Sequence, residues 1–256
     1  MDIKEKNINN LLNLWRLAGE KSGIINQMPH YEFSWIPGSA WPNKLWFNSK
    51  TSSGHVAEAI QVAKTYGLGI SFWDGINIGT DQLESEGFEL KTQLSGMSIE
   101  LGEMIPGKNS LEIIKVKNSL EASRWSDLFE RSFGYRIDSY TVLKTSKLVN
   151  YYIAHSEGQP VGTAVLYSHE AKIAGIHSMG IIPEMRRKGF AEELLLSVLN
   201  IGKASGAEFV TLQSSVMGKG LYLKTGFQDL FTLKTFINKT QNNNEFNRQF
   251  KMEICH

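Results

Sequence analysis

Apolar residues along this chain alternate between helical and strand spacing, and the alternation defines a series of predicted elements. The first half predicts helices over 8–21, 54–66 and 81–86 and strands over 69–73 and 88–101. The second half predicts helices over 120–133, 191–204 and 219–225, a hairpin over 151–167 and strands over 111–117, 173–182, 209–213, 227–237 and 246–254. The aromatic-rich segment 30–47 shows neither period and is predicted to be irregular.

The helix over 191–204 is amphipathic, with five apolar residues spaced three and four apart: Ala191, Leu194, Leu195, Val198 and Ile201. Such spacing places one helical face against a sheet. The first turn carries Glu192 and Glu193, which suit the positive end of the helix dipole. We expect both carboxylates to point away from any anion bound there.

A cationic turn separates the predicted strand 173–182 from this helix, and it consists of Arg186, Arg187, Lys188 and Gly189. The free N–H groups of a first helical turn bind phosphate well. A glycine lets the chain approach the anion closely because it has no Cβ. The pattern therefore predicts an anion site with mobile cationic side chains; the alternative is a solvated basic turn.

The two halves of the chain share a weak repeat at a constant offset. Two glycines that follow predicted helices lie 206 − 67 = 139 residues apart, and two Gly-Phe pairs lie 226 − 87 = 139 residues apart. A conserved spacing of this kind is typical of a duplicated unit. We therefore predict domains at 1–107 and 108–256. The positions that match 186–189 are Phe47 to Lys50, so the first copy is expected to be degenerate and to bind no cofactor.

Composition narrows the class of protein. The 27 basic and 26 acidic residues balance, which argues against nucleic acid or an anionic membrane as a partner. The single cysteine, Cys255, excludes an intrachain disulfide. Residues 1–6 lack the pattern of a signal peptide, and no apolar run approaches a membrane span. We expect a cytoplasmic protein without a metal site.

Three motifs that follow one another along the chain carry a resemblance to a known family. They are a hairpin over 152–164, the run Arg186-x-x-Gly189-x-Ala191 and the segment Leu221-Tyr222-x-x-x-Gly226-Phe227. Together they resemble the GNAT superfamily of N-acetyltransferases. The resemblance implies an α/β (α+β) fold with a mixed, mostly antiparallel central sheet flanked by helices, here duplicated.

The same resemblance implies acetyl-CoA as donor and direct transfer to a primary amine on a small molecule or peptide. Backbone groups of Met179, Gly180 and Ile181 would bind the pantetheine arm, and the N–H of Ile181 would polarise the thioester carbonyl. Ser215 stands where many members have an Asn whose side chain makes a hydrogen bond. The Ser215 hydroxyl is predicted to make that hydrogen bond instead. The residues implied around the pyrophosphate are Arg186, Arg187, Lys188, Gly189, Phe190, Ala191 and Glu192.

Two side chains are candidates for proton transfer. Tyr222 matches the family's general acid for the departing thiolate, although a tyrosine on a short helix is more often a packing residue. His177 is the candidate base, because an alkyl ammonium with a pKa of roughly 10 must lose a proton before it attacks. Strand alternation predicts that His177, Met179 and Ile181 share one face with Ile173. A structural histidine is the equal alternative.

The acceptor is not identified by the sequence. Trp35, Trp41, Trp46 and Phe47 could form an acceptor cleft or fill a core, and aromatic clusters more often fill cores. A non-catalytic acyl-CoA-binding sensor is the alternative function, and assembly as a homodimer is left open.

Overall fold

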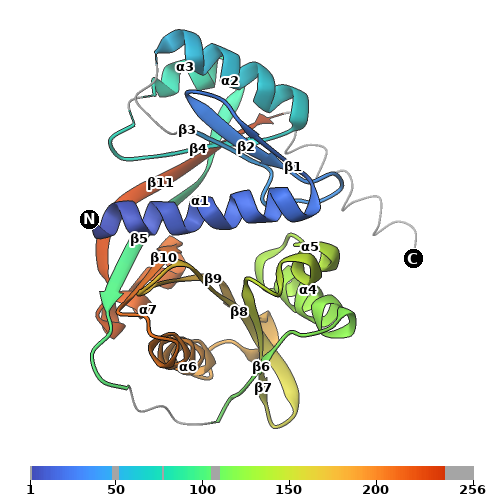
Figure 1. Ribbon diagram of the computed structural model, residues 1–256, viewed down its shortest axis with the longest axis vertical. Coiled ribbons are helices and arrows are strands. Elements are labelled where there is room, and N and C mark those ends of the chain that lie inside the picture. The colour runs from blue at the N-terminus through green and yellow to red at the C-terminus, as the bar shows by residue number, and fades with distance from the viewer. Residues whose placement is uncertain (1, 48–51, 77, 105–109, 240–256) are drawn as a thin grey trace.

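The computed structural model describes residues 2–47, 52–76, 78–104 and 110–239. Within them, eleven strands form one sheet in the order β1-β2-β3-β4-β11-β5-β10-β9-β8-β7-β6. Figure 1 shows two lobes along this sheet, with the long helix α1 lying between them. The mixed, mostly antiparallel sheet with flanking helices confirms the predicted fold class.

The described part of the first half contains three helices and five strands. Their bounds are α1 Ile3–Ser22, β1 Ile24–Gln27, β2 Tyr31–Trp35, β3 Lys44–Phe47, α2 Ser53–Tyr66, β4 Gly69–Trp73, α3 Thr80–Ser85 and β5 Phe88–Glu100. Asp2 caps α1 by accepting a hydrogen bond from the N–H of Lys4. Gly67 ends α2 in the left-handed conformation, as the sequence predicts for a helix-ending glycine.

In its described residues, the second half contains four α-helices and six strands. Their bounds are β6 Glu112–Lys115, α4 Ser119–Phe133, α5 Ser139–Thr145, β7 Asn150–Ser156, β8 Gln159–Glu170, β9 Ile173–Ile181, α6 Phe190–Ala204, β10 Phe209–Ser214, α7 Val216–Thr225 and β11 Gln228–Asn238. A short 3₁₀ turn, Pro183–Met185, separates β9 from the cationic loop. The predicted hairpin turn carries positive φ angles at Glu157 and Gly158.

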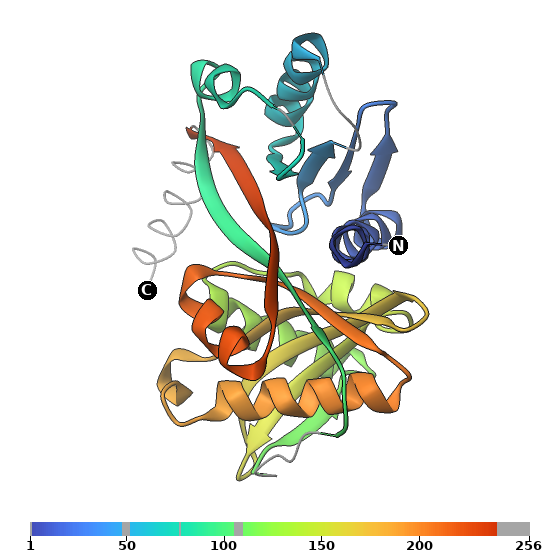
Figure 2. The same cartoon turned by 90° about the vertical axis from the view of Figure 1, so that its left-hand side faces the viewer.

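The two halves exchange their last strands. β5 pairs with β10 of the second half, and β11 pairs with β4 of the first half. Figure 2 shows these two long strands passing through both lobes. The order β1-β2-β3-α2-β4-α3-β5 also matches the order β7-β8-β9-α6-β10-α7-β11. The duplication itself stays a prediction, and the proposed boundary at 107/108 lies outside the described residues.

Some sequence expectations need correction. The segment 30–47 is not irregular, because β2 and β3 pair in it over Tyr31–Phe47. Trp46 and Phe47 are fully buried there, as the core interpretation predicts. The sequence pattern also missed α5. The predicted strand 246–254, Cys255 and most positions that match the cationic loop lie outside the described residues.

Helices cover the second half of the sheet on both faces. On one, which we call the α6 face, α6 and α7 contribute Leu194, Leu195, Val198 and Tyr222 to the core. On the other, the α1 face, Leu14 and Leu17 of α1 pack with Trp125 and Phe129 of α4. None of the helices in the described ranges is both long and apolar enough to cross a bilayer.

Candidate functional site

The central strands β9 and β10 are paired over only part of their length. They run parallel, and the pairing joins Ile173, Ala174 and Gly175 to Phe209, Val210 and Thr211. β9 continues to Ile181 and β10 to Ser214 without further pairing between them. The edge of β9 over 176–181 that faces β10 therefore has backbone groups available for an added ligand. We call this segment the unpaired edge.

A β-bulge at Ser178 changes which face each residue of the unpaired edge presents. Ser178 has φ +49°, and the register with β8 shifts between the pairs Thr163/Gly180 and Val165/His177. The Thr163 hydroxyl donates to the Ser178 carbonyl oxygen at 3.1 Å, which stabilises the bulge. One inserted residue reverses the alternation beyond it.

This bulge overturns the expectation that His177 shares a face with Met179 and Ile181. Met179 and Ile181 contact the core on the α6 face. His177 instead points to the α1 face, where its Nε2 lies 2.8 Å from Oδ1 of Asn10. Simple strand alternation failed because a bulge leaves no clear signal in the sequence.

The cationic loop leads into α6 through two residues with positive φ. Arg187 has φ +62°, and Gly189, the N-cap of α6, has φ +83°. No side chain caps this helix end. The first intrahelical bond runs from the Glu193 N–H to the Gly189 carbonyl, which leaves earlier N–H groups of the turn for an anion.

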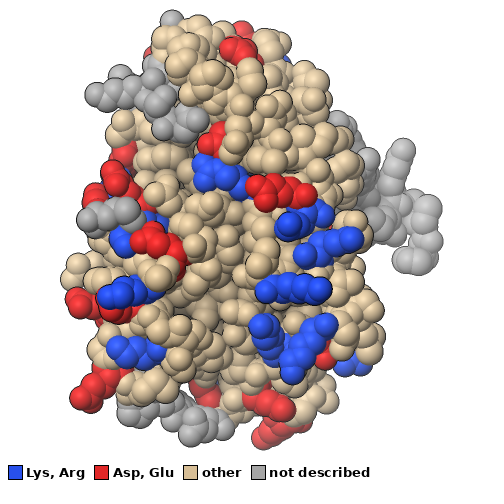
Figure 3. Space-filling model, in the orientation of Figure 1, with Lys and Arg blue, Asp and Glu red and all other residues tan. Residues whose placement is uncertain are grey.

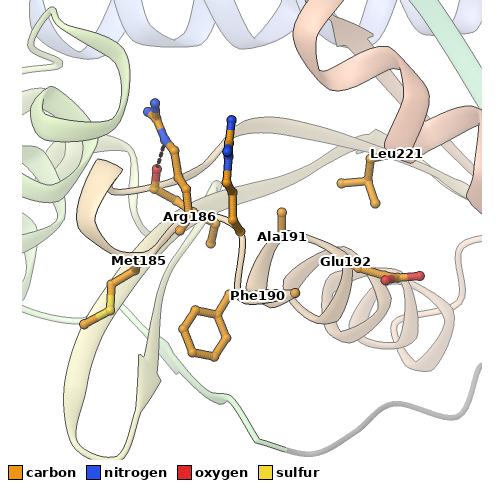
Figure 4. Close-up of a pocket in the computed structure, with 9 residues that line it drawn as sticks. Met185, Arg186, Phe190, Ala191, Glu192 and Leu221 are labelled. Carbon is orange, nitrogen blue, oxygen red and sulfur yellow. Dashed lines mark hydrogen bonds between the residues drawn. The ribbon is translucent and has the colours of Figure 1, made fainter.

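A pocket lies at this helix end, between the loop and α7 (Figure 4). Its lining includes most of the predicted pyrophosphate residues and adds Met185 and Leu221. The lining residues are Ile181, Met185, Arg186, Arg187, Gly189, Phe190, Ala191, Glu192 and Leu221. Lys188 is exposed, and its Nζ lies 3.6 Å from the Met185 sulfur.

Arg186 is not the mobile cation that the sequence suggested. Its Nε donates to the Ile181 carbonyl oxygen and its Nη2 to the Ser132 carbonyl oxygen, each at 3.0 Å (Figure 4 draws the first bond). The side chain therefore joins the loop to β9 and α4. Arg187 is exposed and makes no hydrogen bond or ion pair with the residues that the structure describes.

The two acidic residues of the first α6 turn have different partners. Glu192 pairs with Lys224 of α7 at 3.1 Å. Glu193 is buried, and its carboxylate accepts hydrogen bonds from the hydroxyl and N–H of Ser110 and from the N–H of Leu111. Glu193 thus holds the start of the second half against α6. The partners of both carboxylates reduce their electrostatic repulsion of an anion bound at the start of α6.

Tyr222 lies on α7 within the core of the α6 face and is only 9% exposed. A Cβ on Gly218 would lie 3.3 Å from the Tyr222 ring and 3.4 Å from the Ser214 hydroxyl, so Gly218 lies between the ring and the end of β10. Burial raises the pKa of Tyr222 to about 12. Ser215 caps α7 by accepting from the Gly218 N–H at 3.3 Å.

His177 belongs to a polar cluster that sequence reasoning missed. The cluster contains Asn7 and Asn10 of α1 and Gln213 of β10. Loss of hydration lowers the pKa of His177 to about 4, and a hydrogen bond with Gln213 opposes this shift. The available signal was two asparagines within the apolar stripe of a helix, where polar residues need partners.

Positive charge is unevenly distributed around this region. In Figure 3, Lys and Arg gather on the α4–α5 side of a central hollow, whereas acidic and basic residues mix on the opposite side. Within the described residues, no three His, Cys, Asp or Glu side chains are grouped as metal ligands.

The start of α6 has no side-chain cap, and it lies beyond the partly paired central strand β9. Residues 118–227 match the model of the Acetyltransferase (GNAT) family, so this part of the chain is a GNAT-family acetyltransferase domain. No curated protein matches the sequence.

Solved structures show the same fold over nearly the whole chain. A GCN5-related N-acetyltransferase from Kribbella flavida is 14% identical, with a TM-score of 0.68 and coverage of 91% of this chain and 96% of that one. A putative GNAT-family acetyltransferase from Novosphingobium aromaticivorans is also 14% identical, with a TM-score of 0.61 and coverage of 91% and 95%. These likenesses confirm the GNAT fold and say nothing of the acceptor.

Proposed function

We propose that the protein transfers an acetyl group from acetyl-CoA to a primary amine by direct attack in a ternary complex. The observation that carries the proposal is the uncapped start of α6 at Gly189, directly beyond the unpaired edge of β9. A helix start of this kind can bind a pyrophosphate through backbone N–H groups. The pocket lined by Ile181, 185–187, 189–192 and Leu221 provides the space.

The unpaired edge fits the rest of the donor. Backbone groups of Met179, Gly180 and Ile181 would bind the pantetheine arm as an added strand does. The Ile181 N–H would stabilise the oxyanion that forms when the thioester carbonyl is attacked. Ser215 already caps α7, so any contact with the donor would have to share its hydroxyl.

His177 and Tyr222 lie on opposite faces of the sheet and suit opposite proton transfers. In the proposed reaction, the amine nitrogen bonds to the carbonyl carbon and transfers a proton to His177. The bond between that carbon and sulfur then breaks, and Tyr222 donates a proton to the thiolate. A pKa of about 12 keeps the Tyr222 phenol protonated at neutral pH, as an acid requires.

The low pKa of His177 favours a second candidate function. A base with a pKa of about 4 draws a proton weakly from an ammonium with a pKa of roughly 10. The alternative is therefore a protein that binds acyl-CoA as a sensor without turnover. The cytoplasmic location and the homodimer stay predictions.

Calorimetric titration with acetyl-CoA, followed by thiol release against a panel of amines, tests the proposal. We expect saturable binding and amine-dependent release of CoA. Binding without release for any amine, including amino acids and peptide N-termini, would support the sensor. No binding would contradict both functions.

A further inference from the structure

Two of the four asparagines of helix α1, Asn7 and Asn10, are fully buried against the α1 face. Asn7 donates from Nδ2 to the carbonyl oxygens of Met97 and Leu212, at 2.8 and 3.3 Å. Asn10 donates from Nδ2 to the Tyr167 carbonyl oxygen at 2.9 Å. These bonds orient both amides, because only the nitrogen can donate to a carbonyl.

The two amide oxygens then face the point where β9 and β10 stop pairing. His177 and Gln213 each lie two residues beyond the last pair, Gly175 and Thr211, so they point to the same side of the sheet. Gln213 donates from Nε2 to Oδ1 of Asn7 at 2.5 Å, and His177 Nε2 lies 2.8 Å from Oδ1 of Asn10. On the α1 face, Asn7 thus contacts β10 through Gln213, and Asn10 contacts β9 through His177.

Gly175 makes this approach sterically feasible. A Cβ at this position would lie 1.9 Å from Oδ1 of Asn10 and 2.5 Å from Nε2 of His177. Real side-chain atoms do not come so close, so a larger residue would push the helix and the imidazole apart. The close packing at Gly175 therefore holds the Asn10 amide oxygen against the His177 ring.

The 2.8 Å contact with Asn10 determines the tautomer of the neutral imidazole; the hydrogen bond with Gln213 stabilises the charged ring. The oxygen of Asn10 can only accept, so His177 Nε2 must carry the proton. The lone pair of the ring is then on Nδ1. We infer that Asn10 is a positioning residue, which holds His177 as the Nε2–H tautomer and so assigns proton acceptance to Nδ1. The tautomer rests on the contacts alone, whereas its effect on turnover rests on the proposed function.

Nitrogen NMR of the histidine rings tests the tautomer directly. In the intact protein near pH 7, we expect the His177 spectrum to show a protonated Nε2 and an unprotonated Nδ1. The chain has six histidines, so the signal is assigned by its loss in His177→Gln. A protonated Nδ1, or an even mixture of tautomers, would overturn the inference whether or not the protein has enzymatic activity.

Three variants test the effect on catalysis. Asn10→Ala should mix the tautomers and lower kcat by about tenfold, since general base catalysis contributes roughly 10²–10⁴ in rate. The KM for acetyl-CoA should stay within about twofold, because the donor pocket lies on the α6 face. Asn10→Asp keeps an acceptor for Nε2–H but loses the donor to the Tyr167 carbonyl oxygen, so it should retain the Nε2–H signal and recover part of kcat. Asn9→Ala, at an exposed position of the same helix, is the matched control.

The outcomes separate the two proposals. If the intact protein shows no turnover with any amine, the proposed function fails, and the ring spectra still decide the tautomer. If it turns over and Asn10→Ala keeps both the spectrum and kcat, the positioning role is contradicted. Should Asn10→Ala melt below the working temperature, the comparison of Asn10→Asp with the intact protein decides: a lost Nε2–H signal in Asn10→Asp would also contradict it.

Discussion

Arg186 and Ser132 are hydrogen bonded across 54 positions of sequence, with Nη2 of the guanidinium 3.0 Å from the carbonyl oxygen. The bond ties the loop before α6 to the end of α4. Arg186→Ala removes this bond and the bond to the Ile181 carbonyl oxygen, so it should lower the free energy of unfolding by about 1–2 kcal/mol, since each charged hydrogen bond contributes roughly 1 kcal/mol at a partly exposed site. Chemical denaturation measures this loss.

Arg187→Ala is the matched control for that change. Arg187 has no such partners among the described residues, so its removal should change the unfolding free energy by less than about 0.5 kcal/mol. Calorimetry should instead show weaker acetyl-CoA binding for Arg187→Ala, because a cation beside the pyrophosphate is lost. Equal destabilisation by the two substitutions would contradict the distinction.

Gly189 and Gly206 mark the two ends of α6, with φ +83° and +89°. A Cβ at either position would meet no atom within 4 Å, so substitution adds backbone strain of about 1 kcal/mol rather than a clash. Gly189→Glu should abolish acetyl-CoA binding by placing a carboxylate at the anion site. Gly206→Glu should carry the same strain and bind normally; calorimetry on both compares them, and a shared loss would contradict the loop assignment.

Glu193 and its neighbour Glu192 offer a second matched pair. Removal of the Glu193 carboxylate takes the acceptor away from exposed Ser110 and half-buried Leu111, and the lost hydrogen bonds together should cost about 1–3 kcal/mol. Glu193→Ala should therefore be destabilising by that amount in urea denaturation. Glu192→Ala removes only an exposed ion pair, which contributes at most about 1 kcal/mol. A smaller loss for Glu193→Ala than for Glu192→Ala would contradict this account.

Local patterns predicted most of the fold because helices and strands leave regular periods in sequence. The strand 69–73 and the start of α6 agree with the structure within a residue. The site was less predictable. The bulge at Ser178 depends on tertiary contacts, including the Thr163 hydroxyl, and Asn10 meets His177 across 167 positions. Neither relationship follows from spacing along the chain.

Because of His177, the free energy of unfolding is expected to fall in mildly acidic solution. Its pKa is about 4 in the folded state against 6.5 as a reference for the unfolded chain. A lowered pKa means that the unfolded state binds the proton first, so stability is complete above pH 6.5 and falls as pH drops toward 4. The slope from one group is at most about 1.4 kcal/mol per pH unit. Urea denaturation at pH 7 and 5 should show a larger loss for the intact protein than for His177→Gln, and equal losses would contradict the assignment.

Tyr222 and Tyr152 belong to the same core cluster on the α6 face. A comparison of the two variants that lack one hydroxyl therefore separates a catalytic role of Tyr222 from a general effect on packing. Tyr222→Phe should lower kcat by about tenfold or more, because a general acid contributes roughly 10²–10⁴ in rate. The Kd for acetyl-CoA should stay within about twofold. Tyr152→Phe should change neither. Stopped-flow thiol release and calorimetry measure both quantities, and a pKa of about 12 predicts no loss of the Tyr222 contribution up to pH 10. Unchanged kcat in Tyr222→Phe would assign the proton of the departing thiolate to solvent.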